Sequence, residues 1–168
     1  MDNYEIEKKF LVKSLPADLD IYQCHHITQG YLCRRPAVRV RREDDVCYLT
    51  YKGIRTPGVL AQEEYNLALT SEACSHLMEK ADGAVIRKKR YVIPMEDGPE
   101  GRVIELDVFE GEFEGLVVAE VEFDSEDEAA GFVPPGWFGG EVTADMHYSN
   151  AWLSENASVW REYCLPLE

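Results

Sequence analysis

The sequence contains no apolar run of roughly 18 residues, the minimum for a helix that crosses a membrane. Its first residues also lack the basic-then-apolar order of a secretory signal. Its five cysteines are odd in number and form no CxxC pair, which disfavours both a disulfide framework and a zinc site. We therefore expect a cytoplasmic protein with reduced thiols and no membrane partner.

Positive charge is also scarce. Lys and Arg number 17 against 32 Asp and Glu, so the net charge is −15. This balance disfavours a surface that binds nucleic acid or an anionic membrane. Nevertheless, more than half of the cations fall within residues 34–42 and 87–90. Their concentration predicts a bound anion or, equally well, two basic strand faces exposed to solvent.

Linkers, repeats and low-complexity segments are missing as well, so residues 1–168 are interpreted as one domain. Alternating polar and apolar residues between Gly, Pro and Asp clusters predict eight strands. The expected strands are 3–12, 26–34, 37–43, 46–53, 61–70, 84–94, 102–110 and 117–124. Helical patterns are fewer and predict helices over 71–81, 126–132 and 150–163. The predicted fold class is α+β, with an antiparallel sheet whose eight strands are enough to close a barrel.

Charged side chains recur on one face of these strands. Because side chains alternate between faces, Glu5, Glu7 and Lys9 share a face opposite Ile6 and Phe10. The same alternation holds in five further strands. Their polar or charged faces carry Arg39 and Arg41; Tyr48, Thr50 and Lys52; Gln62, Glu64 and Asn66; Glu105 and Asp107; Glu120 and Glu122. Residues 87–90 are basic on both faces and do not indicate which side points inward.

Two arrangements explain this pattern. Antiparallel sheets commonly expose one polar face to water, so an open sheet is the first. However, Arg39 with Arg41, and Glu120 with Glu122, are like-charged pairs that repel unless a ligand of opposite sign joins them. The second arrangement is a closed barrel with a charged lumen. Its cations would bind a polyanion, and its carboxylates would bind Mg²⁺ or Mn²⁺, which prefer oxygen ligands.

Ordered blocks along nearly the whole chain resemble the CYTH superfamily, the triphosphate tunnel metalloenzymes. Glu5-x-Glu7-x-Lys9 resembles the ExExK signature of that superfamily. The later blocks are Gln29-Gly30-Tyr31-Leu32, Arg39-x-Arg41, Thr50-x-Lys52, Glu63-Glu64-Tyr65, Lys88-x-Arg90-Tyr91, Glu105-Leu106-Asp107-Val108-Phe109, Glu120-Val121-Glu122-Phe123, Pro134-Pro135-Gly136-Trp137-Phe138-Gly139 and Glu141-Val142-Thr143-x-Asp145-x-x-Tyr148-x-Asn150. ExExK alone is a weak signal, but all blocks in order are specific. The likeness is to small single-domain bacterial members.

The resemblance implies an eight-stranded antiparallel tunnel that hydrolyses triphosphate compounds with Mg²⁺ or Mn²⁺. The residues that match phosphate-binding cations are Arg39, Arg41, Lys52, Lys88 and Arg90. The residues that match metal-binding carboxylates are Glu5, Glu7, Glu120 and Glu122, with Glu64 and Asp107 as accessory ligands or water-positioning groups. Lys9 and Tyr31 match a pair that activates the attacking water, and Lys9 is also a candidate substrate contact. By analogy, the helix near 150–160 closes one tunnel mouth.

Three positions depart from the family pattern. Asn66 stands at a position that can carry a second acidic residue, and Met146 and His147 stand at positions that are often basic. These departures reduce the expected number of carboxylates and weaken the expected grip on the far end of the substrate. The sequence also leaves open whether Glu105 or Asp107 reaches the metal.

We expect the substrate to be inorganic tripolyphosphate, with ATP or other nucleoside triphosphates as further substrates. The reason is that no base-reading or thiamine-reading insertion is recognisable. A class IV adenylate cyclase, a thiamine triphosphatase and a non-catalytic polyphosphate or nucleotide sensor are the alternatives. The sequence is compatible with a homodimer but does not decide the oligomeric state.

Overall fold

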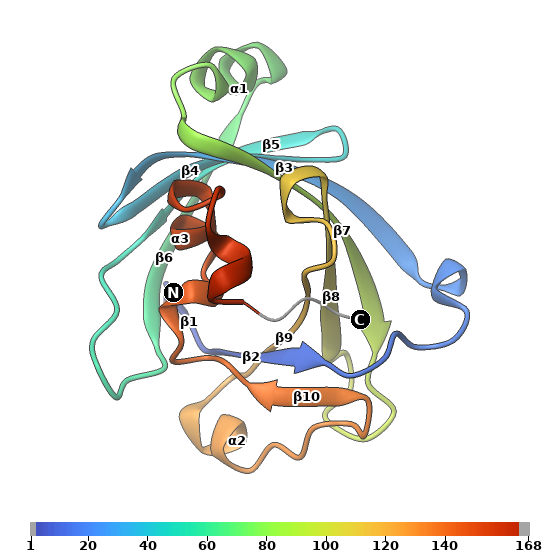
Figure 1. Cartoon of the computed structure of the whole chain (residues 1–168). Helices are drawn as coiled ribbons and strands as arrows, with labels where there is room; N and C mark the ends of the chain where they lie inside the picture. The colour runs from blue at the N-terminus through green and yellow to red at the C-terminus, as the bar shows by residue number, and fades with distance from the viewer. Residues whose placement is uncertain (1–2, 165–168) are drawn as a thin grey trace.

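The computed structural model describes residues 3–164, and a ten-stranded sheet forms most of it (Figure 1). The strands are β1 (Tyr4–Glu5), β2 (Glu7–Val12), β3 (Gln23–Arg34), β4 (Ala37–Glu43), β5 (Val46–Lys52), β6 (Gln62–Leu69), β7 (Asp82–Pro94), β8 (Val103–Glu110), β9 (Val117–Glu122) and β10 (Phe138–Glu141). Their hydrogen-bonded order is β1-β6-β5-β4-β3-β7-β8-β9-β2-β10. All of these pairings are antiparallel. The predicted α+β class with an antiparallel sheet is therefore confirmed.

The expected eight-stranded closed barrel is not confirmed, because the strand order has ten members and ends at β1 and β10. The first predicted strand divides at Ile6. Glu5 in β1 pairs with Gln62 of β6, whereas Glu7 in β2 pairs with Glu122 of β9. β10 was not predicted, and it adds to the free edge of β2. The short segment around Ile6 thus carries the chain from one end of the strand order nearly to the other.

Helices occupy less of the chain. Within the described residues they are α1 (Ser71–Met78), α2 (Glu126–Ala130) and α3 (Asn150–Glu155), with 3₁₀ turns η1 (Leu19–Ile21), η2 (Gly111–Phe113), η3 (Met146–Tyr148) and η4 (Trp160–Glu162). The predicted cap of α2 forms, because the Ser125 hydroxyl accepts a hydrogen bond from the Glu128 amide. The third predicted helix was wrong as a single element. It ends at Asn156, whose side-chain amide donates to the Trp152 carbonyl and competes with helical hydrogen bonding. Of these helices, none is long and apolar enough to cross a membrane.

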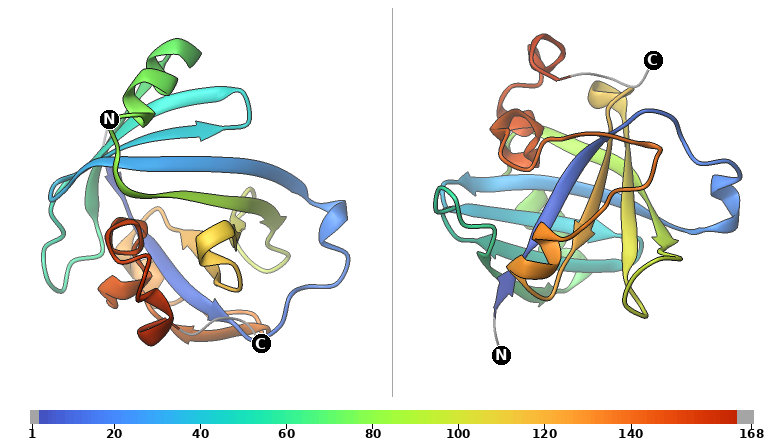
Figure 2. Two further views of the ribbon diagram at one scale, coloured as in Figure 1. Left: turned by 45° about the horizontal axis from the view of Figure 1, so that its top comes forward. Right: turned by 90° about the horizontal axis from the view of Figure 1, so that it is seen from below.

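The outer face of the sheet is apolar and is covered by helices. α1 stands outside β4 and β5, where its Cys74 packs against Val40 and Cys47 (Figures 1 and 2). α2 covers a larger cluster on the other side of the molecule, in which Ala129 packs with Phe10 and residues of β8 to β10. The alternation read from the sequence therefore places apolar side chains outward, beneath the helices.

The C-terminal segment lies across one end of the curved sheet, as Figure 2 shows. Leu153 of α3 and Trp160 of η4 are buried there among Ile86 and Val118, and the Trp160 indole donates to the Glu112 carbonyl at 2.9 Å. This end of the inner face is therefore apolar and packed. The charged residues lie farther along the same strands.

Candidate functional site

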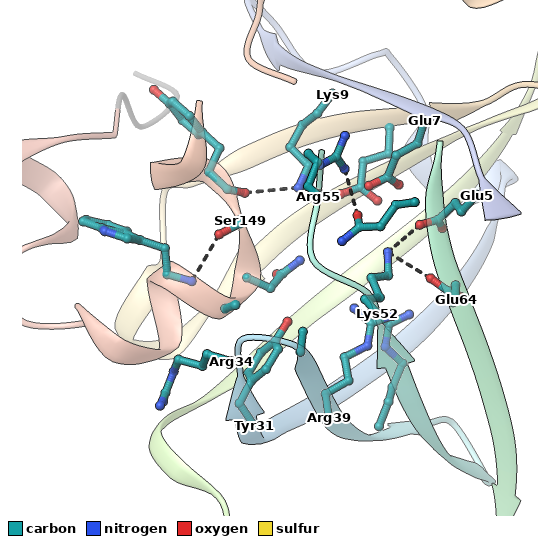
Figure 3. Close-up of a pocket in the computed structure, with 18 of the residues that line it drawn as sticks. Glu5, Glu7, Lys9, Tyr31, Arg34, Arg39, Lys52, Arg55, Glu64 and Ser149 are labelled. Atoms are coloured by element: carbon teal, nitrogen blue, oxygen red, sulfur yellow. Dashed lines mark hydrogen bonds and ion pairs between the residues drawn. The ribbon is translucent and has the colours of Figure 1, made fainter. Parts of the chain in front are cut away.

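The charged faces of the strands converge on a cavity of about 900 Å³ (Figure 3). Strands β1 to β9 all contribute to its lining, and residues 142–146, 148–152 and 155 complete one side. Most of the residues predicted for the site line this cavity. They are Glu5, Glu7, Lys9, Tyr31, Arg39, Arg41, Lys52, Glu64, Arg90, Glu120 and Glu122. The two that do not line it are Lys88 and Asp107.

Three buried arginines form one part of the site, which we call the arginine region: Arg39 and Arg41 from β4, and Arg90 from β7. None is more than 8% exposed. The Arg41 Nε donates to Gln29 Oε1 at 2.9 Å, whereas the buried Arg39 Nε has no hydrogen-bond partner. Burial, followed by the charges of Arg39 and Arg90, lowers the pKa of Arg41. These guanidiniums repel one another, and an anion among them would relieve that repulsion.

Lys88 and Asp107 lie behind the arginine region, with both side chains 0% exposed. The Lys88 Nζ is 2.5 Å from Asp107 Oδ2. Burial lowers the pKa of Lys88 to about 8, although the charge of Asp107 opposes this shift. On β8 it is Glu105, not Asp107, that lines the cavity. The structure therefore separates two carboxylates that the sequence places on one face.

Four carboxylates form the other part of the site, which we call the acidic region: Glu5, Glu7, Glu64 and Glu122. The Lys52 ammonium lies among them, 2.5 Å from Glu5 Oε2 and 3.0 Å from Glu64 Oε2 (Figure 3). Burial, followed by the charge of Glu7, raises the pKa of Glu5 to about 8. The same two causes raise the pKa of Glu122. One lysine therefore does not neutralise this group of acids.

Asn66 supports the acidic region from β6. It accepts a hydrogen bond from the Thr50 hydroxyl at 2.7 Å, and its amide donates to Glu64 Oε1 at 2.8 Å. Burial alone would raise the pKa of Glu64, but Lys52 and the Asn66 amide lower it to about 2. The departure noted at this position thus gives Glu64 a neutral hydrogen-bond donor as its neighbour, where an acid would have repelled it.

The donor chemistry of the acidic region fits a hard divalent cation, because four carboxylates crowd there, and burial together with the charge of Glu7 raises the pKa of both Glu5 and Glu122. In residues 3–164, however, no three His, Cys, Asp or Glu side chains are already arranged around a metal position. Glu120 lies apart from this crowding, paired with Lys9 and Arg90 at 3.0 Å each. A bound cation would therefore require carboxylates to move from their ion pairs.

Lys9 and Tyr31 enter the cavity from opposite sides (Figure 3). The Lys9 ammonium is 3.0 Å from Glu120 Oε1 and donates to the Tyr148 carbonyl at 3.1 Å. Burial would lower its pKa, but Glu120 and Glu7 outweigh burial and raise it. The Tyr31 hydroxyl accepts from the Gln29 amide at 3.4 Å. In this geometry Lys9 is a cation, and the lowered pKa required of a general base is not produced.

The two remaining departures differ in position. Met146 lines the cavity and is 64% exposed. His147 is outside the lining: its backbone amide and Nδ1 bind Asp145 Oδ1, and its ring stacks on Tyr163 with centroids 4.8 Å apart.

Sequence reasoning missed Arg55 and Gln29 as residues of the site, and it left the choice between Glu105 and Asp107 open. Glu105 and Arg55 line the cavity, and the buried Gln29 orients Arg41. Gln29 could have been found, because it lies two residues before Tyr31 on one strand face. Arg55 lies in the loop between β5 and β6, where strand alternation gives no information.

The fold and the site define a class of protein in which a mostly antiparallel sheet surrounds a cavity shared by arginines and carboxylates. No family model matches the sequence. An inorganic triphosphatase of Nitrosomonas europaea is 37% identical over 153 residues, which cover 89% of this chain and 96% of that protein. An inorganic triphosphatase of Acetivibrio thermocellus is 40% identical over 161 residues, covering 90% and 94%. The chain belongs to the inorganic triphosphatase family.

Solved structures agree with this assignment. The crystal structure of the inorganic triphosphatase NE1496 has a TM-score of 0.64 and 35% identity, covering 89% of this chain and 93% of that one. A Hippeastrum protein described as a putative adenylyl cyclase with a dominant triphosphatase activity has a TM-score of 0.60. It is only 19% identical but covers 98% of this chain and 99% of its own, so it supports the fold alone.

Proposed function

We propose that this protein hydrolyses inorganic tripolyphosphate, with ATP as a further substrate. The proposal rests on one observation: buried arginines and crowded carboxylates line the same cavity. Both curated relatives described above are named inorganic triphosphatases, which supports the same substrate. We further propose that the curved sheet acts as a tunnel around the phosphate chain, since charged side chains from nine of its strands line the cavity.

The arginine region is the proposed binding site for the phosphate chain. Arg39 has a buried Nε without a hydrogen-bond partner, so this donor is available to a phosphoryl oxygen. Gln29 holds the Arg41 side chain at its Nε, which fixes the direction of the remaining donors. Positioned cations stabilise the charge that spreads over phosphoryl oxygens during transfer, and this is the main contribution that these residues offer.

The acidic region is the proposed site for Mg²⁺ or Mn²⁺, held by Glu5, Glu7, Glu64 and Glu122. A bound ion of this kind neutralises phosphoryl oxygens and makes water a better nucleophile. Lys52 lies between Glu5 and Glu64, so we expect it to turn toward the substrate when these acids bind a cation. Glu120 is assigned a different role: its ion pairs hold the side chains of Lys9 and Arg90 in position.

Lys9 is proposed as a cationic contact to the phosphoryl group undergoing transfer. Its raised pKa keeps it protonated, so it can donate a hydrogen bond but cannot accept a proton from water. Activation of water by the pair of Lys9 and Tyr31 would require Lys9 to leave Glu120 first. Tyr31 would then orient the attacking water through its buried hydroxyl, which is supported by Gln29.

The test is a phosphate-release assay with tripolyphosphate, ATP and thiamine triphosphate, each with Mg²⁺, with Mn²⁺ and with EDTA. We expect release from tripolyphosphate to be fastest and to cease in EDTA. The same ATP reactions should be analysed for cyclic AMP. Formation of cyclic AMP without phosphate release would contradict the proposal in favour of a cyclase, and tight binding without any product would contradict it in favour of a sensor.

A further inference from the structure

We infer that Asp107 is a positioning residue that fixes the guanidinium of Arg90, and that it does not bind the metal. This inference rests on the proposed function, because it concerns how the site holds a phosphate chain. It gives Asp107 a different role from the accessory metal ligand that its place beside Glu105 on β8 suggests.

Arg90 has hydrogen bonds to three acids. Its Nε is 2.7 Å from Asp107 Oδ1 and its Nη2 is 2.8 Å from Asp107 Oδ2, which is a bidentate contact. Its Nη1 is 2.5 Å from Glu105, and its Nη2 also reaches Glu120 at 3.0 Å. Of these acids, only Asp107 binds the guanidinium through two nitrogens, so Asp107 alone defines the plane of the group.

Both oxygens of Asp107 are already bound to cationic side chains and are buried away from the cavity. Both oxygens bind Arg90, and Oδ2 additionally binds the Lys88 ammonium at 2.5 Å. The carboxylate is 0% exposed and does not line the cavity, whereas Glu105, with a side chain 39% exposed, does. Asp107 is therefore a buried acid placed between Lys88 and Arg90, and of these three side chains only Arg90 lines the cavity.

The physical consequence concerns where Arg90 would point without Asp107. A guanidinium released from its bidentate partner would be attracted by Glu105 and Glu120, the two remaining acids on its path. It already donates to both of these acids, but no bidentate contact would then fix the plane of the group, so its donors would no longer be held in one direction for a phosphate chain. Asp107 prevents this by holding Arg90 from behind, on the side away from the substrate.

The experiment compares two affinities of the Asp107→Asn variant with those of the wild type. Calorimetry in EDTA gives the Kd for tripolyphosphate, and calorimetry without substrate gives the Kd for Mn²⁺. We expect the Kd for tripolyphosphate to rise about 10-fold or more, because Arg90 would no longer be held in position to donate to the phosphate chain. The Kd for Mn²⁺ should change by less than about 2-fold. A Kd for Mn²⁺ raised about 10-fold with unchanged tripolyphosphate binding would overturn the inference.

Asp107→Glu covers the case in which Asp107→Asn does not fold. It keeps the charge but moves the carboxylate by one methylene, so a positioning role predicts weaker tripolyphosphate binding, and wild-type binding would contradict it. Coupling gives a second check: in an Arg90→Lys background, which lacks the bidentate fork, Asp107→Asn should have little further effect. An undiminished effect there would also count against the inference.

Glu128→Gln is the matched control, because Glu128 is likewise an acid paired with an arginine, 2.6 Å from Arg102, but on the outer side of the sheet. It should leave both affinities unchanged. Since both affinities are measured without turnover, the outcome is independent of the phosphate-release assay. A failure of the proposed hydrolysis and a failure of this inference can therefore be told apart.

Discussion

The arginine region and the acidic region are built from the same kind of strand, yet their charges are balanced differently. In the arginine region, buried Asp107 holds Arg90 and Gln29 holds Arg41. In the acidic region one lysine faces several carboxylates, and burial, followed by the charge of Glu7, raises the pKa of Glu5 to about 8. Both regions thus hold like charges close together, but two of the three arginines are fixed by other side chains of the protein, whereas Lys52 is the cation paired with the acids of the acidic region.

The largest effect should come from the arginine region. Arg39→Ala removes a buried donor that we assign to the phosphate chain, so kcat/KM for tripolyphosphate should fall about 100-fold, mainly through KM. Steady-state kinetics at saturating Mn²⁺ measure this. Arg42→Ala is the control, since Arg42 is on the outer face of β4 and binds Ser71 at 3.2 Å. If kcat/KM for tripolyphosphate fell equally in Arg39→Ala and Arg42→Ala, the two faces of β4 would not differ in function.

The next effect concerns the acidic region. Glu122→Gln should raise the half-saturating Mn²⁺ concentration about 10-fold and lower kcat, while the KM for tripolyphosphate changes less. A Mn²⁺ titration of phosphate release provides the measurement. Glu110→Gln is the control, because Glu110 pairs with Lys89 at 3.6 Å outside the cavity. Unchanged Mn²⁺ dependence in Glu122→Gln would remove this carboxylate from the proposed metal site.

The raised pKa of Glu5 gives the acidic region a pH dependence. The folded protein binds a proton at Glu5 between pH 4.5 and about 8 that the unfolded chain releases, so stability without metal should fall as pH rises through this window. Mn²⁺ requires the ionised carboxylate, so its affinity should rise over the same window. Thermal melting and calorimetry from pH 5 to 9 test both trends. In Glu5→Gln, stability and Mn²⁺ affinity should depend much less on pH. If both still change with pH as in the wild type, another group is responsible.

The smallest effect should come from Asn66. Asn66→Ala leaves the buried Thr50 hydroxyl without its acceptor, which should cost about 1 kcal/mol in the free energy of unfolding. Urea denaturation measures this cost. Asn66→Asp keeps an acceptor for Thr50 but loses the donor to Glu64, so it should lose less stability than Asn66→Ala. If Asn66→Asp proved less stable than Asn66→Ala, repulsion from Glu64 would outweigh the Thr50 contact.

Strand alternation predicted much of the site, and its failures have physical causes. It placed Arg39, Glu64 and Glu122 on the polar faces of regular strands, and the family resemblance implied that these faces point into a tunnel. It could not separate Glu105 from Asp107, since both share a face, and only the packing against Lys88 and Arg90 distinguishes them. It also could not find Arg55, which belongs to a loop.

The fold was predicted in a similar way. Most strands and the cap of α2 follow local patterns, and these were confirmed within residues 3–164. The division of the first strand at Ile6 is decided by pairing with two different strands, β6 and β9, far apart in the sequence. The addition of β10 likewise depends on the free edge of β2, which no local pattern encodes.

The sequence by itself determined which residue types share a strand face, because backbone geometry alternates side chains whatever the surroundings. It therefore determined that Arg39 lies on the same strand face as Arg41, and Glu120 on the same strand face as Glu122. Only the tertiary structure decided which of those charges meet the cavity and which are buried behind it. That outcome depends on curvature and register between strands, and these set the distances on which charge pairing depends.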